Sequence, residues 1–182
     1  MKSRVIIAAL AAALVLAGCG SNGDADLASD DHAHIDPLNP DHMAPEQVAT
    51  TAMGVILSWK PTEDASPTDA FQRARRWLGG KLRDAANVTT TAPSGVRPDP
   101  RWVSWRESRD VISAACVRSD STPAAPEGMR TLVIDVTCRQ NVLHVGGAIT
   151  PLTPETWRTT VTRTGDGWLL TDYRFLSTGS SR

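Results

Sequence analysis

The chain has 182 residues and a formal net charge of −1, with 19 basic and 20 acidic side chains. This near-neutral balance argues against a dedicated nucleic-acid binder, because such proteins usually carry a basic excess. Hydrophobic residues make up 41% of the composition, as in a globular protein, and the length suits one domain rather than two. Six tryptophans outnumber two phenylalanines and one tyrosine, and the alanine, arginine and proline usage suggests a GC-rich bacterium.

The N-terminus has the pattern of an export signal. Lys2 and Arg4 precede an unbroken apolar run at residues 5–15, which is too short for a usual membrane span and typical of a signal peptide. The run leads into Leu-Ala-Gly-Cys at residues 16–19, which resembles the lipobox of bacterial lipoproteins at every position. The resemblance implies that residues 1–18 are removed and that Cys19 carries acyl chains, palmitate among them. The mature chain, with a charge of about −3, would then sit at the extracytoplasmic face of the cell membrane.

Residues 19–43 have the composition of a flexible tether, rich in Gly, Ser, Asp and Pro. His32, His34 and His42 lie in it, and short histidine-rich tracts can bind transition metals. The spacing of His32 and His34 does not place them on one helix face, however, and two prolines prevent a regular scaffold. We therefore interpret the stretch as a solvated acidic linker and predict neither a metal nor another cofactor.

The folded domain is expected at residues 44–176 and begins with helices. Pro45 suits a first helical position, and apolar residues recur at helical spacing until Pro61. Ser66 and Asp69 form a capping pattern for a second helix that ends near Gly79 and Gly80, with a short turn at residues 81–86. The outer face of the second helix carries Arg73 and Arg76, which could bind an anionic wall polymer or lipid headgroup. We favour a solvated helix face.

Strands are expected after a proline-rich turn at residues 92–100. We predict a strand at 101–108, with Val103 and Trp105 on one side, and a mostly apolar strand at 110–118 that is buried on both faces. A loop at 120–128 precedes a strand whose alternate residues from Leu132 to Cys138 face the core. Residues 141–150 are ambiguous. Residues 155–164 and 168–175 form a closing hairpin, followed by a disordered tail at 177–182.

Cys116 and Cys138 remain once Cys19 is acylated, and an even pair outside the cytoplasm favours a disulfide. The alternative is two inert buried thiols. A catalytic or metal-binding role is disfavoured, because neither cysteine lies in a C-x-x-C pattern or beside a histidine.

The order of elements predicts an α+β fold, in which N-terminal helices pack on a curved antiparallel sheet of about four strands. It resembles the nuclear-transport-factor-2-like, or cystatin-like, superfamily. The segments SPTDAFQRARRWLGG and ETWRTTVTRTGDGWLLTDYRF are similar to actinobacterial extracytoplasmic domains related to the eighth VirB component of type IV secretion and to conjugation proteins. Such relatives are commonly anchored by a transmembrane helix, whereas a lipobox stands here, so an accessory role stays open.

The same superfamily includes SnoaL-type isomerases and dehydratases, which need a carboxylate or histidine base in an apolar cone. Candidates for such a base are Asp135 and His144. Asp172 and Tyr173 are adjacent and therefore lie on opposite faces of their strand. No P-loop, H-E-x-x-H, G-x-S-x-G or dinucleotide glycine motif is present. We predict that the protein is not an enzyme.

Tryptophans offer a possible interaction surface. Trp102 and Trp157 stand beside arginines, which would suit a protein or glycan contact, although an arginine can also cover an indole without any ligand. The predicted function is a lipid-anchored, non-catalytic binding or assembly module of a cell-envelope complex with a protein partner and no nucleic acid. The alternative is a small-molecule carrier or SnoaL-type enzyme that uses the cone between the helices and the sheet.

Overall fold

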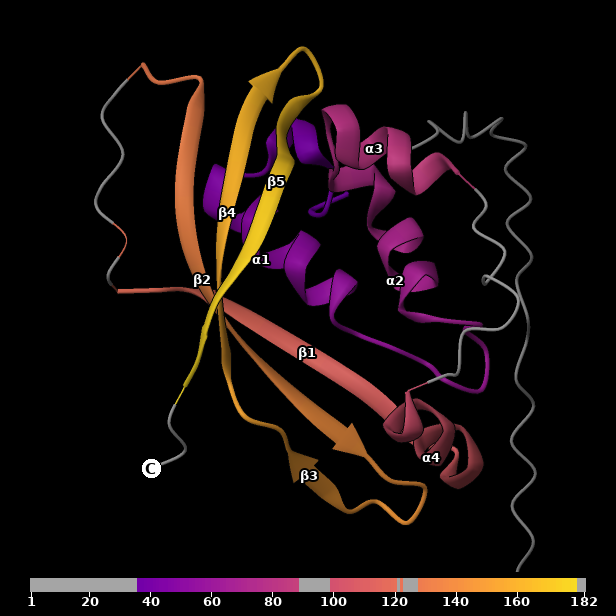
Figure 1. The fold of residues 1–182 in the computed structure, drawn as a ribbon. Helices are drawn as coiled ribbons and strands as arrows, with labels where there is room; N and C mark the ends of the chain where they lie inside the picture. Colours follow the sequence, from indigo (N-terminus) through magenta and orange to yellow (C-terminus); the bar gives the residue numbers. More distant parts are fainter. Residues whose placement is uncertain (1–35, 89–98, 121, 123–127, 180–182) are drawn as a thin grey trace, which may run out of the picture. The chain divides into compact units, whose positions relative to one another are not determined.

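The computed structural model of the protein describes residues 36–88, 99–120, 122 and 128–179, in which helices pack on an antiparallel sheet. This confirms the predicted α+β class (Figure 1). The helical elements are η1 (Pro40–His42), α1 (Pro45–Ile56), α2 (Pro67–Arg73), η2 (Ala74–Trp77), α3 (Gly80–Asn87) and α4 (Pro100–Ser108). The strands are β1 (Val111–Arg118), β2 (Thr131–Leu143), β3 (Ile149–Pro151), β4 (Glu155–Thr164) and β5 (Gly167–Thr178).

Helix α1 starts at Pro45 as predicted. The Gln47 side chain accepts a hydrogen bond from the Ala44 N–H (2.9 Å), which satisfies a donor that the first helical turn leaves free. The helix contacts β1, β2, β4 and β5, so it crosses the whole inner face of the sheet. Its side chains on this face, Val48, Ala52, Met53 and Ile56, are buried.

Helix α2 confirms the predicted cap. Ser66 Oγ accepts from the Thr68 N–H (3.2 Å), and the Asp69 carboxylate accepts from the Ala65 N–H (2.5 Å). The chain tightens into η2 and breaks at Leu78, which makes an isolated parallel bridge with Leu170 of β5. These caps and breaks place the second half of the helical layer against β5.

The strand predicted at residues 101–108 is wrong, because this segment is helix α4. Asp99 accepts a hydrogen bond from the Arg101 N–H (2.8 Å), and Pro100 takes the first helical position. Val103 and Trp105 fit an alternating strand pattern, but the Asp99 cap favours a helix because it satisfies a backbone N–H that the first helical turn leaves free. Arg106 ties α4 to the preceding loop by donating to the Pro61 carbonyl (2.7 Å).

The sheet has the order β1-β2-β4-β5, all antiparallel, and β3 pairs with the end of β2. Strand β2 alternates as predicted, with Leu132, Ile134, Val136 and Cys138 buried. Strand β1 is not buried on both faces. Strand β1 forms an edge of the sheet, and Val117 is exposed. A central position in the sheet therefore does not explain why β1 is apolar.

The core lies between α1 and the inner sheet face, and its largest fully buried side chains include Met53, Leu78, Ile112 and Leu170. Trp77 is buried there, whereas Trp59 is half-buried and packs against the core. Within the described residues, no helix is both long and apolar enough to cross a membrane.

Both ends of the folded unit extend beyond residues 44–176. Pro40 and Met43 are buried, and Trp77 Nε1 donates to the Leu38 carbonyl (3.0 Å), so residues 38–43 pack on the domain instead of continuing the tether. At the other end β5 pairs with β4 as far as Thr178. The remainder of the predicted tether and tail, like most of the predicted loop at 120–128, lies outside the described residues.

Candidate functional site

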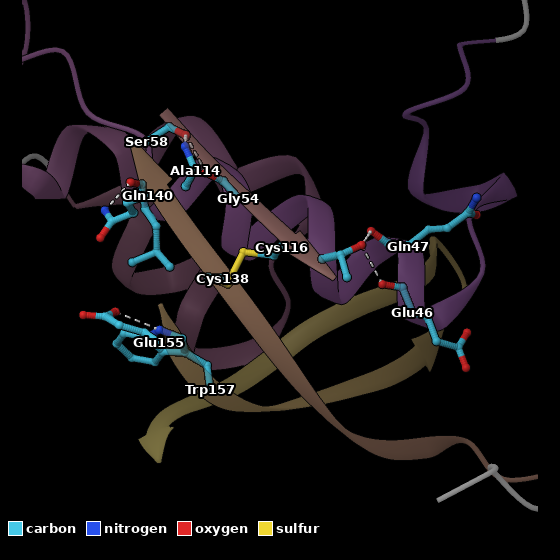
Figure 2. The surroundings of a disulfide bond; sticks show 12 residues. Glu46, Gln47, Gly54, Ser58, Ala114, Cys116, Cys138, Gln140, Glu155 and Trp157 are labelled. Atoms are coloured by element: carbon cyan, nitrogen blue, oxygen red, sulfur yellow. Dashed lines mark hydrogen bonds between the residues drawn. A yellow bond between two sulfur atoms is a disulfide. The ribbon is translucent and has the colours of Figure 1, made fainter. Parts of the chain in front are cut away.

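The predicted disulfide between Cys116 and Cys138 is present and joins two directly opposite residues of β1 and β2. Figure 2 shows it near Gly54 of α1 and near Ser58, which follows this helix. Cys138 is buried in the core and Cys116 is half-buried at its edge. The bond therefore fastens the edge strand to the sheet at the point where α1 crosses it.

Strand β1 leaves part of its outer edge unpaired. Ile112 exchanges both backbone hydrogen bonds with Trp59 (2.8 and 2.9 Å), so its N–H and C=O point away from β2. Alternate residues of an antiparallel strand point the same way, so those of Ala114 and Cys116 do too. The Ala114 N–H donates to Ser58 Oγ (3.0 Å). In the described part of the chain no group pairs with the Cys116 N–H or with the carbonyl oxygens of Ala114 and Cys116.

A groove of about 760 Å³ runs beside this edge. One wall is formed by Thr51, Val55 and neighbouring residues of α1, and the other by residues 111–116 of β1. Its only charged lining residues in the described structure are Lys60 and Arg73, which form ion pairs with Glu63 and Asp64 respectively. The groove thus combines an apolar surface with backbone groups that lack partners.

Gly54 lies where α1 faces the edge strand. A methyl group at this position would lie 3.6 Å from the Ala114 carbonyl oxygen, which is ordinary van der Waals contact. Gly54 has an ordinary helical backbone, so the residue is needed neither for its conformation nor to avoid a clash. Because glycine has no side chain, nothing projects from this position into the groove.

His144, a candidate base, is held at the hairpin between β2 and β3. Its Nδ1 lies 3.0 Å from Asp110 Oδ1 and its Nε2 lies 2.9 Å from Thr150 Oγ1. Asp110 is buried, and the Ser108 hydroxyl, which donates to it, and His144 together lower the pKa of this carboxyl. Asp110 orients the imidazole, and Thr150 is not among the residues that line the groove between α1 and β1. The arrangement braces the hairpin against the start of β1.

A pocket of about 370 Å³ lies between the helices and the sheet. Its walls are apolar and aromatic, with Trp59, Phe71, Trp157 and Tyr173 among them. Tyr173 is the single titratable side chain in the described lining, and burial raises its pKa, which keeps the phenol neutral at physiological pH. A carboxylate or histidine base, as SnoaL-type chemistry requires, is absent from this described lining.

Asp135 lies on the outer sheet face and not in the cone. It forms a two-pronged ion pair with Arg158 on the neighbouring strand (2.8 and 2.9 Å), and this hydrogen-bonded guanidinium lowers the pKa of the carboxyl. A general base for neutral pH needs the opposite shift. Asp172 is exposed, whereas Tyr173 faces the pocket, as the predicted alternation requires.

The predicted interaction residues are dispersed. Trp102 is buried and packs against Trp59 with ring centres 6.1 Å apart, so it is not an exposed contact. Trp157 is half-buried and donates to Glu155 (3.1 Å; Figure 2). Arg73 is engaged by Asp64, and Arg76 pairs with Asp36 and lies over the Trp77 ring. In the described structure both arginines form ion pairs that connect parts of the helical layer.

No metal-binding cluster of histidine, cysteine or acidic side chains occurs in the described residues. His42 is exposed at the end of η1, while His32, His34 and Cys19 lie outside the described part. The sequence therefore identified the disulfide but missed the groove. The available signal was the apolar composition of β1, which also fits a strand that is buried on both faces.

Comparisons with known proteins add little to this geometry. No family model matches the chain, and no curated protein matches it. Among solved structures, CagV, a VirB8 homologue of the T4SS from Helicobacter pylori strain 26695, is 8% identical, with 71% of this chain and 94% of that chain covered and a TM-score of 0.43. The intermembrane space region of the chloroplast protein ARC6 is 13% identical, with 74% and 98% covered and a TM-score of 0.35. Neither similarity is high enough to assign a family or a function.

Proposed function

We propose that this protein is a lipid-anchored, non-catalytic binding module of a cell-envelope complex, held at the outer face of the cytoplasmic membrane through Cys19. The observation that carries the proposal is the unpaired edge of β1 at Ala114 and Cys116 beside an apolar groove. A strand edge of this kind binds an extended polypeptide through backbone hydrogen bonds, while the groove selects its side chains. The ligand class is therefore a protein segment in extended conformation.

The proposed location at the outer face of the cytoplasmic membrane is supported by the lipobox at residues 16–19 and the short apolar run before it. The disulfide between Cys116 and Cys138 fits an oxidising compartment outside the cytoplasm. An anchored domain meets other proteins of the same membrane at a raised effective concentration, so a groove of modest affinity suffices for assembly.

A non-catalytic role is supported by the chemistry of the two sites. The groove has no titratable side chain in its described lining apart from Lys60 and Arg73, and both are paired with carboxylates. In the described lining of the cone pocket, Tyr173 is the one titratable side chain. Acid–base catalysis needs a group that exchanges protons near neutral pH, and neither lining supplies one.

The aromatic pocket in the cone supports a second candidate function, the carriage of a small apolar ligand. Four aromatic side chains around about 370 Å³ would take a flat hydrophobic molecule. Quenching of tryptophan fluorescence by an apolar dye tests this function. Saturable quenching that Tyr173→Ala weakens supports it, and the same quenching in both proteins contradicts it.

Site-specific crosslinking in a native type of host tests the main proposal. A photoreactive residue at Thr51, which lines the groove, should give a discrete adduct in the membrane fraction. The matched control is the same residue at exposed Lys81 on α3, which should give none. A Cys19→Ala variant should leave the membrane fraction and lose the adduct. Equal adducts at both positions, or none at Thr51, would contradict a binding groove.

A further inference from the structure

The tip of the β2–β3 hairpin is an exposed apolar surface. Val145 and Ile149 are 74% and 63% exposed, more than most large hydrophobic side chains of the described residues. The turn between them is narrow: the His144 N–H donates to the Ala148 carbonyl (2.9 Å), and Gly147 takes a positive φ of 83°. Two apolar side chains therefore flank a thin, glycine-containing turn, a shape that can enter a groove.

The hairpin carries no formal charge. Residues 140–154 contain no lysine, arginine, aspartate or glutamate, although such residues make up 21% of the chain. A surface loop normally needs charged or polar groups for solubility, so a long uncharged stretch with exposed apolar tips indicates a contact surface. The contact that suits it is apolar and free of unpaired charge, as the groove between α1 and β1 is.

The hairpin and this groove are neighbours on the molecule. Val111 and Leu143 are paired across β1 and β2, and both line the end of the groove. The chain passes directly from Leu143 into the hairpin turn. A protrusion beside a hollow that accepts it is self-complementary under a two-fold rotation, because each copy inserts its protrusion into the other's hollow.

We propose that the groove is occupied by the β2–β3 hairpin of a second copy of this chain, in a two-fold symmetric dimer. This rests on the proposed function of the groove as a protein-binding site and names its partner. In the dimer Val145 and Ile149 lie in the partner's groove. The Cys116 N–H donates to an extended segment of the hairpin, and the carbonyl oxygens of Ala114 and Cys116 accept from it.

The chain enters the described domain at the end of the sheet opposite the hairpin. Pro40 of η1 packs against Gly167 at the start of β5, so the N-terminal segment enters at the β4–β5 end of the sheet. Strand β2 begins beside that end, where Thr131 pairs with Thr162, and its 13 residues lead to the hairpin. At a rise of about 3.3 Å per residue the hairpin lies about 40 Å away.

Figure 1 shows β3 at the opposite end of the sheet from the turn between β4 and β5. The chain that leads to Cys19 therefore joins the described domain at the end of the sheet opposite the hairpin.

Residues 19–182 with Cys19→Ser provide a suitable protein for the test, since the whole described core lies in residues 43–170. Sedimentation velocity from micromolar to near-millimolar concentration should show a monomer–dimer equilibrium. Val145→Asp and Thr51→Arg should each weaken association at least about tenfold, because each places a charge in an apolar contact. Circular dichroism melting should stay unchanged, since Val145 is exposed and Thr51 only half-buried.

Mixing the two variants gives the decisive result. The Val145→Asp chain keeps an intact groove and the Thr51→Arg chain keeps an intact hairpin, so a mixed dimer retains one of its two contacts. The mixture should associate more strongly than either variant alone and less strongly than the unaltered chain. The matched control is Val133→Asp, an exposed valine on the outer sheet face, which should leave association unchanged.

Three outcomes would overturn the second copy as the partner: a monomer at every concentration, no recovery in the mixture, or an equal loss with Val133→Asp. A hairpin that instead inserts into lipid would show binding of the unaltered chain to phosphatidylglycerol vesicles, lost with Val145→Asp. If the chain does not dimerise but a photoreactive residue at Thr51 crosslinks to a different protein in membranes, the proposed function stands and the dimer is excluded. If neither dimerisation nor a crosslink is found, both the proposed function and the dimer are excluded.

Discussion

At the β4–β5 end of the sheet, the first residues of the folded unit cover the strands, whereas at the β2–β3 end the apolar side chains lie bare. Pro40 is buried against Gly167, and Trp168 is buried beneath Arg163. Val145 and Ile149 at the other end are both exposed. The two turns are alike in having a glycine at φ 83°, Gly167 in one and Gly147 in the other.

This difference between the two ends of the sheet indicates which end binds a partner. At the β4–β5 end, the chain's own residues bury the apolar side chains and pair the backbone groups of the sheet. An end that keeps apolar tips, a groove and unpaired backbone groups has surface that a partner can bury. The ion pair of Asp135 and Arg158 on the outer face shows that the same sheet uses charge where it meets solvent.

Substituting the two matched glycines gives the largest expected difference. A methyl group on Gly167 would lie 2.3 Å from the Pro40 carbonyl oxygen, whereas none of the surrounding atoms lies within 4 Å of one on Gly147. Gly167→Ala should lower the free energy of unfolding by about 4 kcal/mol, from left-handed strain plus overpacking, and Gly147→Ala by about 1 kcal/mol from strain alone. Urea unfolding measures both. Equal losses would mean that the two ends are packed alike.

Removal of the disulfide should have the next largest effect. Cys116 and Cys138 are 22 residues apart, and closing such a loop stabilises the fold by about 3 kcal/mol in the chain-entropy model. Cys116→Ala with Cys138→Ala should lose this amount in urea unfolding and weaken dimerisation, because the edge strand loses its tie to β2. The control is Cys19→Ala, which should leave stability unaltered. An unchanged midpoint in the double variant would show that the bond does not constrain the chain.

Acid should loosen the hairpin end through Asp110. The Ser108 hydroxyl and His144 hold the pKa of this carboxyl below its usual value near 3.9. A lowered folded pKa contributes stability above the usual value, and this is lost as pH falls through the folded pKa. Hydrogen exchange at residues 144–149 should therefore accelerate below about pH 4, and Asp110→Asn should show the faster exchange already at pH 7.

Asp36 at the covered end supplies the comparison. Its pKa is lowered by hydrogen bonds from Arg76, but both side chains are half exposed. Such surface pairs contribute little, so Asp36→Asn should leave exchange at residues 144–149 unchanged. A similar acceleration in both variants would show that charge loss acts generally and not through the Asp110 brace.

Gly54→Ala should have the smallest effect and the opposite sign. The site is helical, and the added methyl group meets the Ala114 carbonyl oxygen at 3.6 Å without a clash. Alanine in a helix interior is about 0.5–1 kcal/mol more favourable than glycine, so the free energy of unfolding should rise by that amount. A loss of stability in thermal or urea unfolding would mean that the edge strand lies closer to α1 than described.

Local signals in the sequence predicted the elements that depend on local chemistry. Pro45, the Ser66 and Asp69 cap, the alternation of β2 and the turn at Gly165–Gly167 all specify structure within a few residues. Helix α4 was missed although Asp99 and Pro100 carry the same kind of signal, because Val103 and Trp105 also fit an alternating strand. Periodicity over so few residues does not separate the two.

The groove could not be predicted, since it depends on which strand forms the edge of the sheet. Strand order depends on contacts between residues far apart in the sequence. An apolar segment such as residues 111–117 fits either a central strand or an edge strand that binds another protein. Likewise nothing local tells that His144 meets Asp110, which lies 34 residues away. The disulfide was predictable because the count of cysteines restricts it independently of the fold.

Hydrogen exchange as a function of protein concentration tests the central claim most directly, that the bare end of the sheet is the end a second copy covers. In residues 19–182 with Cys19→Ser, dilution to monomer should speed exchange in the peptides that contain β1 and residues 143–149, and leave the β4–β5 turn unchanged. Exchange that is independent of concentration at both ends, or that changes only at the β4–β5 turn, would contradict it.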